Sequence, residues 1–335
     1  MSNSFELLIA RWKIEKLIMR IKNKIEMKKI NLFIFLMISC TAGLFAQSEF
    51  QYAQVVNNLG WVNPSYYGMS RDITGTFVYA NRLDGQLTSE GFDIHGGLPY
   101  QHLGFGVQGN FNNFGLRKQS IIGLDANIDL RVSCNSYLLF GMFVGYDLQR
   151  FSGDATTDVG FDADPSGLNL ANYNATNLMT SFGATYVYKG FRLGSSLRWS
   201  IRDRETIENK NLLTYYGHAE YEFLVDKFAI RPLFIYMWNQ EVGSNNDLGV
   251  MFGYNKLANL GVLYRATNSF KPKSFAVLAD LTIAKSATLF FDYEFGLSDH
   301  SNIRPSWELG LRFNLNKALN RESFDKRETI RNFAW

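Results

Sequence analysis

The chain has 335 residues, of which 15% are aromatic, and its 34 Lys and Arg exceed its 31 Asp and Glu by only three. Eight basic but only three acidic residues lie in the first 46 positions, so the rest of the chain keeps 26 basic (34 less 8) and 28 acidic (31 less 3) residues and offers no basic surface to nucleic acid. Beyond residue 46 no apolar run reaches the roughly 18 residues that a membrane-spanning helix needs.

The first 46 residues have the organisation of an export leader. Two lysines precede the apolar run 30–38, and Ala46 supplies a small residue at a cleavage point, as in a secretory signal peptide. We therefore expect residues 27–46 to be the signal peptide. Residues 1–26 are then either an over-extended gene start or a basic amphipathic leader. A lipoprotein cleavage site at Cys40 is the alternative.

Residues 47–71 form a polar, irregular lead-in. Within it the run 63–68, Asn-Pro-Ser-Tyr-Tyr-Gly, places Pro and Gly on either side of aromatic residues. Such a run suits a turn packed into a pore or against its rim better than a strand. We predict that this stretch is an N-terminal plug in or at a lumen.

Residues 72–315 carry the alternation of β-strands. In the stretch 118–131, for example, Leu124 and Ile128 share one face while Asp125 and Asp129 share the other, because successive side chains on a strand point in opposite directions. Long, aromatic-rich alternation is typical of strands with lipid on one side and a polar lumen on the other. The predicted fold class is all-β, a transmembrane antiparallel β-barrel of about 14 strands. These are 72–82, 87–98, 102–113, 118–131, 137–150, 176–188, 190–201, 212–224, 227–239, 246–254, 257–267, 273–284, 287–297 and 304–315.

The lengths of the connections predict an orientation. Connections from even to odd strands are short, whereas the odd-to-even set includes the long polar stretches 151–175 and 202–211. In bacterial outer-membrane barrels the short turns face the periplasm. We therefore expect a periplasmic N-terminus. Residues 316–335, too densely charged for a lipid-facing strand, are expected to form a short periplasmic tail.

The polar strand faces carry both signs of charge. In a barrel these side chains either pair with one another across the lumen or hold the 47–71 segment or a partner peptide. The candidate lumen-facing contacts are Arg131, Arg192, Arg198, Glu220, Glu222, Arg265, Asp292, Glu294 and Arg312. No catalytic, cofactor or metal site is predicted, because the four histidines are scattered and no GxSxG or HExxH motif is present.

Several short motifs, in this order, resemble the PorP/SprF family of Bacteroidetes type IX secretion. The run 63–68 resembles the family's NPAYAG-type opening, and the match continues in later stretches up to about residue 315. Its motif residues are Asn63, Pro64, Ser65, Tyr66 and Gly68. The later stretches are Tyr79 to Arg82, Leu98-Pro99, Gly104 to Val107, Gly141 to Asp147, Leu263 to Arg265, Asp292-Tyr293, and Ser306 to Leu309, where Trp307 replaces a common His.

The resemblance implies an outer-membrane barrel, not an enzyme, that binds the C-terminal domain of a large secreted adhesin. Such a protein supports export or surface anchoring of the adhesin, including adhesins of gliding motility. Its implied partners are that domain, the periplasmic components of type IX secretion and outer-membrane lipid, with no nucleic acid and no cofactor. The alternative is a transporter for hydrophobic small molecules, since fatty-acid uptake barrels share the strand number and an N-terminal segment in the lumen. An outer-membrane phospholipase is a third reading, but the sequence cannot place the Ser and His that it needs.

Overall fold

The computed structural model describes residues 52–82, 87–98, 102–115, 117–151, 174–201, 212–240, 243–267, 271–297 and 305–319. The expected leader, with its signal peptide, lies outside the described residues, as do the first residues of the lead-in and residues 320–335 of the expected tail. Among the described residues no helix is long and apolar enough to cross a membrane.

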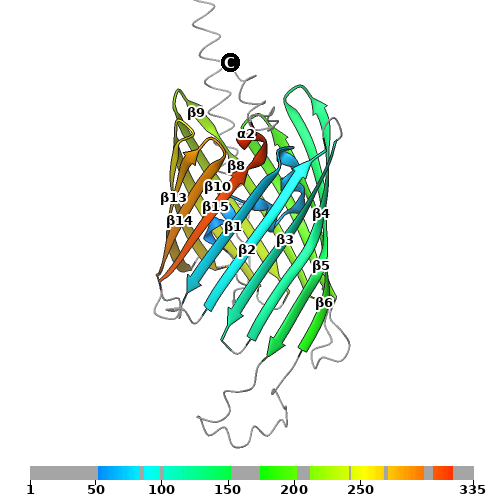
Figure 1. The fold of residues 1–335 in the computed structure, drawn as a ribbon. Helices are drawn as coiled ribbons and strands as arrows, with labels where there is room; N and C mark the ends of the chain where they lie inside the picture. The colour runs from blue at the N-terminus through cyan, green and yellow to red at the C-terminus, as the bar shows by residue number, and fades with distance from the viewer. Residues whose placement is uncertain are drawn as a thin grey trace, which may run out of the picture. The chain divides into compact units, whose positions relative to one another are not determined.

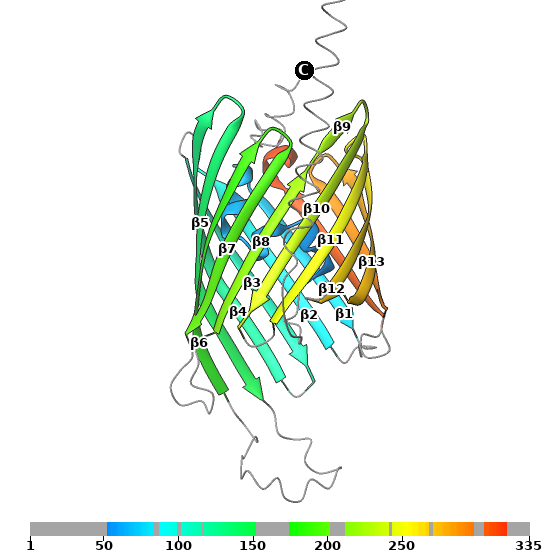
Figure 2. The same ribbon diagram turned by 180° about the vertical axis from the view of Figure 1, so that it is seen from behind.

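The described residues form one continuous antiparallel sheet that closes on itself (Figure 1 and Figure 2). The first strand, β1, pairs with the last, β15, and β10 pairs with β11. These pairings leave no open edge between neighbouring strands of the barrel. The strands are β1 (Thr74–Arg82), β2 (Leu87–Gly97), β3 (Leu103–Phe114), β4 (Arg117–Ser133), β5 (Ser136–Phe151), β6 (Asn174–Tyr188), β7 (Phe191–Ile201), β8 (Leu212–Tyr221), β9 (Phe223–Val225), β10 (Phe228–Asn239), β11 (Gly243–Tyr254), β12 (Ala258–Thr267), β13 (Pro272–Ala284), β14 (Ala287–Gly296) and β15 (Ser306–Asn314).

The fifteen labelled strands make a barrel of fourteen strands. β8 and β9 both pair with β10, and only Glu222 separates them, so they are two parts of one barrel strand. The predicted fold class is therefore confirmed, and a barrel strand lies at each of the fourteen predicted places. The last strand ends at Asn314, one residue before its predicted end. The short helix α2 (Leu315–Ala318) follows, and the Asn314 side chain accepts a hydrogen bond from Lys317 N at 2.9 Å.

Apolar side chains face outward from the barrel wall and charged side chains face inward, the reverse of a water-soluble protein. On β4, Leu124 is 68% exposed whereas the neighbouring Asp125 is 3% exposed. On β15, Leu309 is 49% exposed and Glu308 fully buried. An apolar exterior around an ionic interior is the arrangement that hydrocarbon surroundings demand, because lipid offers charged side chains no hydrogen bonds.

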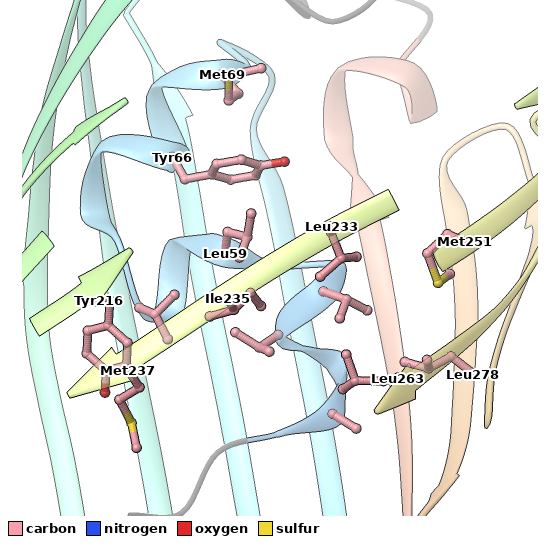
Figure 3. Packing of buried hydrophobic residues seen from close by; sticks show 14 of the residues in the cluster. Leu59, Tyr66, Met69, Tyr216, Leu233, Ile235, Met237, Met251, Leu263 and Leu278 are labelled. Atoms are coloured by element: carbon pink, nitrogen blue, oxygen red, sulfur yellow. The ribbon is translucent and has the colours of Figure 1, made fainter. Parts of the chain in front are cut away.

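An apolar core lies inside the barrel and joins the wall to the segment between Tyr52 and Met69 (Figure 3). From this segment it takes Leu59 and other residues, and from β10 it takes Leu233 and Ile235, each 2% exposed. The predicted strand 227–239, which is β10, does not alternate strictly between polar and apolar residues, because its inner face packs on polypeptide instead of water.

The two ends of the barrel differ. One end, uppermost in Figure 1, carries the connections 134–135, 189–190, 226–227, 255–257 and 285–286 together with α2. We call it the short-turn end. The opposite end, here the long-loop end, bears the connections 152–173 and 202–211, whose residues are not among those described. This sorting is the one that the sequence predicts.

Candidate functional site

Residues 52–71, here called the lumen segment, run across the inside of the barrel (Figure 1). They form three short 3₁₀ helices, η1 (Ala53–Val56), η2 (Leu59–Trp61) and η3 (Pro64–Met69). η1 contacts β13 and β14, whereas η3 contacts strands β2 to β6 on the opposite wall. The segment therefore spans the lumen, and most of its residues are buried.

A buried carboxylate holds the start of the segment. Glu308 on β15 accepts hydrogen bonds from Ala53 N at 2.9 Å and from Gln54 N at 3.1 Å. The first N–H groups of a helical turn have no partner within the turn, so an acceptor from the wall satisfies them. Arg82 on β1 lies 3.2 Å from the same carboxylate and compensates its charge.

Three arginines of the wall donate to main-chain oxygens of the lumen segment. A hydrogen bond from a charged donor is stronger than one between neutral groups, so these contacts fix the backbone whatever its side chains are. Arg198 on β7 bonds Trp61 O at 2.6 Å, Arg231 on β10 bonds Val56 O at 3.3 Å, and Arg312 on β15 bonds Asn57 O at 2.7 Å.

Two amide side chains of the segment bind carboxylates on different strands of the wall. Asn57 donates to Asp280 on β13 at 2.9 Å, and Asn58 donates to Asp93 on β2 at 2.6 Å. These pairs add to the hydrogen bonds that buried polar groups need.

The motif run 63–68 is the best-connected part of the segment. Asn63 caps η3, since its Oδ1 accepts from Ser65 N at 3.1 Å and from Ser65 Oγ at 2.7 Å. Its Nδ2 donates to Thr185 Oγ1 at 3.1 Å and faces His218 Nε2 at 3.0 Å, so that nitrogen accepts. Pro64 stands at the first helical position, where its missing N–H costs nothing.

The next residue of the motif reaches a buried ion pair. Tyr66 donates its hydroxyl to Glu220 Oε1 at 2.9 Å. Arg192 lies 2.9 Å from the same carboxylate and 3.2 Å from Glu222. The motif is therefore tied to β6 and β8 by Asn63 and to β8 again by Tyr66.

Two glycines on the wall make room for the motif. Gly141 on β5 and Gly183 on β6 face each other in the strand register. A Cβ atom on Gly183 would lie 2.0 Å from Asn63 Oδ1, and one on Gly141 would lie 2.2 Å from Ser65 N. We call this pair the glycine notch. It lets the backbone of the motif approach the wall more closely than any side chain allows.

We expect Gly183→Ala to push the motif off the wall. Forcing a methyl group into a filled site costs about 1–3 kcal/mol, and the motif also loses its bond to Thr185. The variant should unfold at lower denaturant concentration than the wild-type barrel in detergent. Gly217→Ala is the matched control, because its Cβ would meet Tyr215 Oη at 3.5 Å, an ordinary contact. Equal unfolding midpoints for the two variants would contradict the notch.

A second charged cluster adjoins Glu308 through Arg82, in the half of the barrel nearer the long-loop end. Arg265 on β12 is 3.3 Å from Glu294 and 3.5 Å from Asp247, and Arg82 is 3.4 Å from Glu294. Asp292 on β14 is fully buried beside them. These pairs join strands β1, β11, β12 and β14 across the lumen side of the wall.

The nine side chains predicted to face the lumen lie in different parts of the barrel. Arg198, Glu220 and Arg312 bond the lumen segment directly. Arg192 and Glu222 belong to the Glu220 ion pair, and Arg265, Asp292 and Glu294 belong to the second cluster. Arg131 is exposed and donates to Ser133 O at 3.3 Å. It lies where β4 extends past the start of β3, because the first residue of β3 pairs with Ile128.

Some wall residues that hold the segment are missing from that candidate set. They are Glu308, Arg231, Asp280, Asp93, His218 and Thr185. The charged residues and His218 stand on the predicted polar face, but alternation does not say which of them meets the segment. Only Glu308 had a further signal, since it lies in the stretch Ser306 to Leu309 that resembles the family.

Comparison with known proteins gives one match over most of the chain. The family model described as "Type IX secretion system membrane protein PorP/SprF" matches residues 44–313. No curated protein matches the sequence.

Solved outer-membrane proteins resemble the barrel at low sequence identity. The Acinetobacter baumannii outer membrane protein Omp33 is 9% identical, with a TM-score of 0.43 over 74% of this chain and 99% of its own. A mutant of the Rh. blastica porin is 12% identical, with a TM-score of 0.36 over 72% of this chain and 98% of its own. The NanC porin is 10% identical, with a TM-score of 0.38 over 72% of this chain and 99% of its own.

Proposed function

Since the chain belongs to the PorP/SprF family of type IX secretion system membrane proteins, we propose that it binds the C-terminal domain of a large secreted adhesin. In this role it supports export of the adhesin or its anchoring at the cell surface, as in gliding motility. The family assigns the chain to type IX secretion at the outer membrane. The closed barrel with its apolar exterior is a multi-pass protein of that membrane.

The occupied lumen is the observation that best supports a binding role. A porin passes solutes through an aqueous channel, whereas here polypeptide crosses the channel and is bonded to both walls. A barrel closed in this way acts through the surfaces at its two ends. Those are the surfaces that a secreted domain or a component of the secretion apparatus can reach.

The lining argues against a transporter for hydrophobic compounds. The inner wall presents Asp93, Glu220, Asp280, Glu308 and several arginines, most of them already bonded to the lumen segment or to one another. An apolar solute entering there would strip these groups of their partners without replacing them. The family and the fold are also not enzyme types.

The proposal includes an arrangement of the chain in the cell. Residues 1–46 are the leader, residues 47–71 the plug, residues 72–315 the barrel and residues 316–335 a tail in the periplasm. The short-turn end then faces the periplasmic components of the secretion system, and the long loops face outward. Secreted cargo and periplasmic machinery thus meet opposite ends of one barrel.

Co-purification from native outer membranes tests this function. A tagged copy of the barrel should recover either an adhesin C-terminal domain or a component of type IX secretion. A porin of the same cell carrying the same tag is the control and should recover neither. Recovery of the barrel with no such partner, under conditions that keep the secretion apparatus intact, would refute the proposal.

A further inference from the structure

A cavity of about 200 Å³ lies on the short-turn side of the lumen segment. Its walls come from η3, from the ends of β1, β2, β14 and β15 nearest the short turns, and from α2. The cavity is therefore built by both termini of the described chain together.

The charged side chains that line this cavity are all basic. Lys285, Arg312 and Lys317 line it, and none of its lining residues in the described part of the chain is a carboxylate. The carboxylates behind this lining have partners of their own. Asp280 accepts from Asn57, and Asp72 accepts from Asn314 at 2.7 Å. Asp93 and Asp125, the two carboxylates nearest the Tyr67 hydroxyl, accept from Asn58 and Gln108. A cationic cavity next to solvent attracts anions.

Two residues that line the cavity, Tyr67 and Thr76, carry buried hydroxyl groups. Tyr67 and Thr76 are 3% and 4% exposed, and within the described residues neither hydroxyl oxygen has a hydrogen-bond partner. Burial, together with the charges of Asp93 and Asp125, raises the pKa of the Tyr67 hydroxyl well above its ordinary value, so it stays an O–H donor. Buried hydroxyls without partners are uncommon, because each loses hydrogen bonds that water would supply.

We propose that this cavity binds peptide carboxylates, namely those of Asp or Glu side chains on a protein segment that reaches the short-turn end. Lys285 and Lys317 attract the carboxylate, and the hydroxyl groups of Tyr67 and Thr76 donate to it. The inference rests on the proposed function in one respect, that a protein partner meets this end of the barrel. The carboxylates come either from that partner or from Glu322, Asp325 and Glu328 of this chain, which follow α2 in the sequence.

A binding titration on the full chain in detergent tests the cavity. Fluorescent hexaglutamate is the probe and hexaglutamine its uncharged counterpart. The double variant Lys285→Gln, Lys317→Gln should bind hexaglutamate about tenfold more weakly than wild type, since two charge-assisted contacts are lost. The matched control is Lys189→Gln, Lys227→Gln. It removes two exposed lysines of the same end that do not line the cavity, and its affinity should equal that of wild type.

A chain ending at Leu319 separates the two sources of carboxylate. Tighter hexaglutamate binding by this shortened chain identifies the chain's own acidic residues as the natural occupant. Equal binding by both chains identifies the partner. The cavity proposal is overturned if neither chain prefers hexaglutamate to hexaglutamine. It is also overturned if the two double variants bind alike, or if inorganic phosphate displaces the peptide at equal concentration.

The outcomes for the cavity and for the proposed function are distinct. If the Lys285→Gln, Lys317→Gln barrel binds hexaglutamate as wild type does but still recovers a secretion partner from native membranes, only the cavity proposal fails. If wild type recovers no partner yet binds hexaglutamate in a lysine-dependent way, only the proposed function fails.

Discussion

Deleting residues 48–70 should raise the single-channel conductance of the barrel in planar bilayers by at least about tenfold, because the polypeptide that crosses the lumen is then gone and a water-filled passage remains. The wall does not depend on the lumen segment for its closure, since β1 pairs directly with β15 and β10 with β11. The deleted barrel should therefore still form.

A shorter deletion in a loop controls for leakiness caused by removal of chain. Residues 155–170 lie in the 152–173 connection at the long-loop end, and their removal should leave the conductance at the wild-type level. An unchanged conductance in the 48–70 deletion, with the heat-modifiable gel mobility of a folded barrel retained, would show that the segment does not obstruct the pore.

Glu308→Ala should be the most destabilising single substitution in the lumen. The change removes the acceptor of Ala53 N and Gln54 N and one of the two carboxylates beside Arg82. Breaking a buried pair by removing one partner costs about 3–5 kcal/mol, because the remaining charge stays buried. The midpoint of urea unfolding in detergent should fall accordingly, and conductance fluctuations should appear as the start of the segment detaches.

Two further variants show whether the effect comes from these contacts. Glu308→Gln keeps a carbonyl acceptor for the segment while losing the charge, so its unfolding midpoint should lie between those of wild type and Glu308→Ala. Glu90→Gln alters an exposed carboxylate on β2 and should leave the midpoint unchanged, as surface charges contribute little. A Glu308→Ala midpoint equal to that of Glu90→Gln would mean that Glu308 does not anchor the segment.

The barrel itself could be predicted from the sequence because its signal is local. A strand that separates lipid from a polar lumen alternates every second residue, so β4 and β15 could be recognised without knowing their neighbours. Departures from alternation have physical causes that the structure supplies. On β10, Leu233, Ile235 and Met237 face inward yet are apolar, because they pack against the lumen segment and not against water.

The contacts of the lumen segment could not be predicted in the same way. Glu308 and Ala53 are 255 residues apart, and only closure of the sheet brings them together. Arg131 and Asp129 share one face of β4, and both lie beyond the last residue that pairs with β3. Asp129 is 4% exposed because Arg71 and His102 lie against it, whereas Arg131 is exposed. The alternation of polar and apolar residues shows whether a side chain faces the lumen or the lipid. It does not show where along the barrel axis the residue lies. The glycine notch depends on the register of β5 and β6, which a single strand does not contain.

An engineered disulfide tests the central claim, that the N-terminal segment lies inside the barrel against β6. Ser65 Oγ and Thr185 Oγ1 are 2.7 Å apart, close enough for cysteines at both positions to bridge. The variant Ser65→Cys, Thr185→Cys, with the exposed Cys134 replaced by Ser, is oxidised in native membranes and digested for mass spectrometry. Ser65→Cys with Ser244→Cys on β11 is the control pair. The account predicts a linked peptide for the first pair and none for the second; free Cys side chains at positions 65 and 185 that both react with maleimide would contradict it.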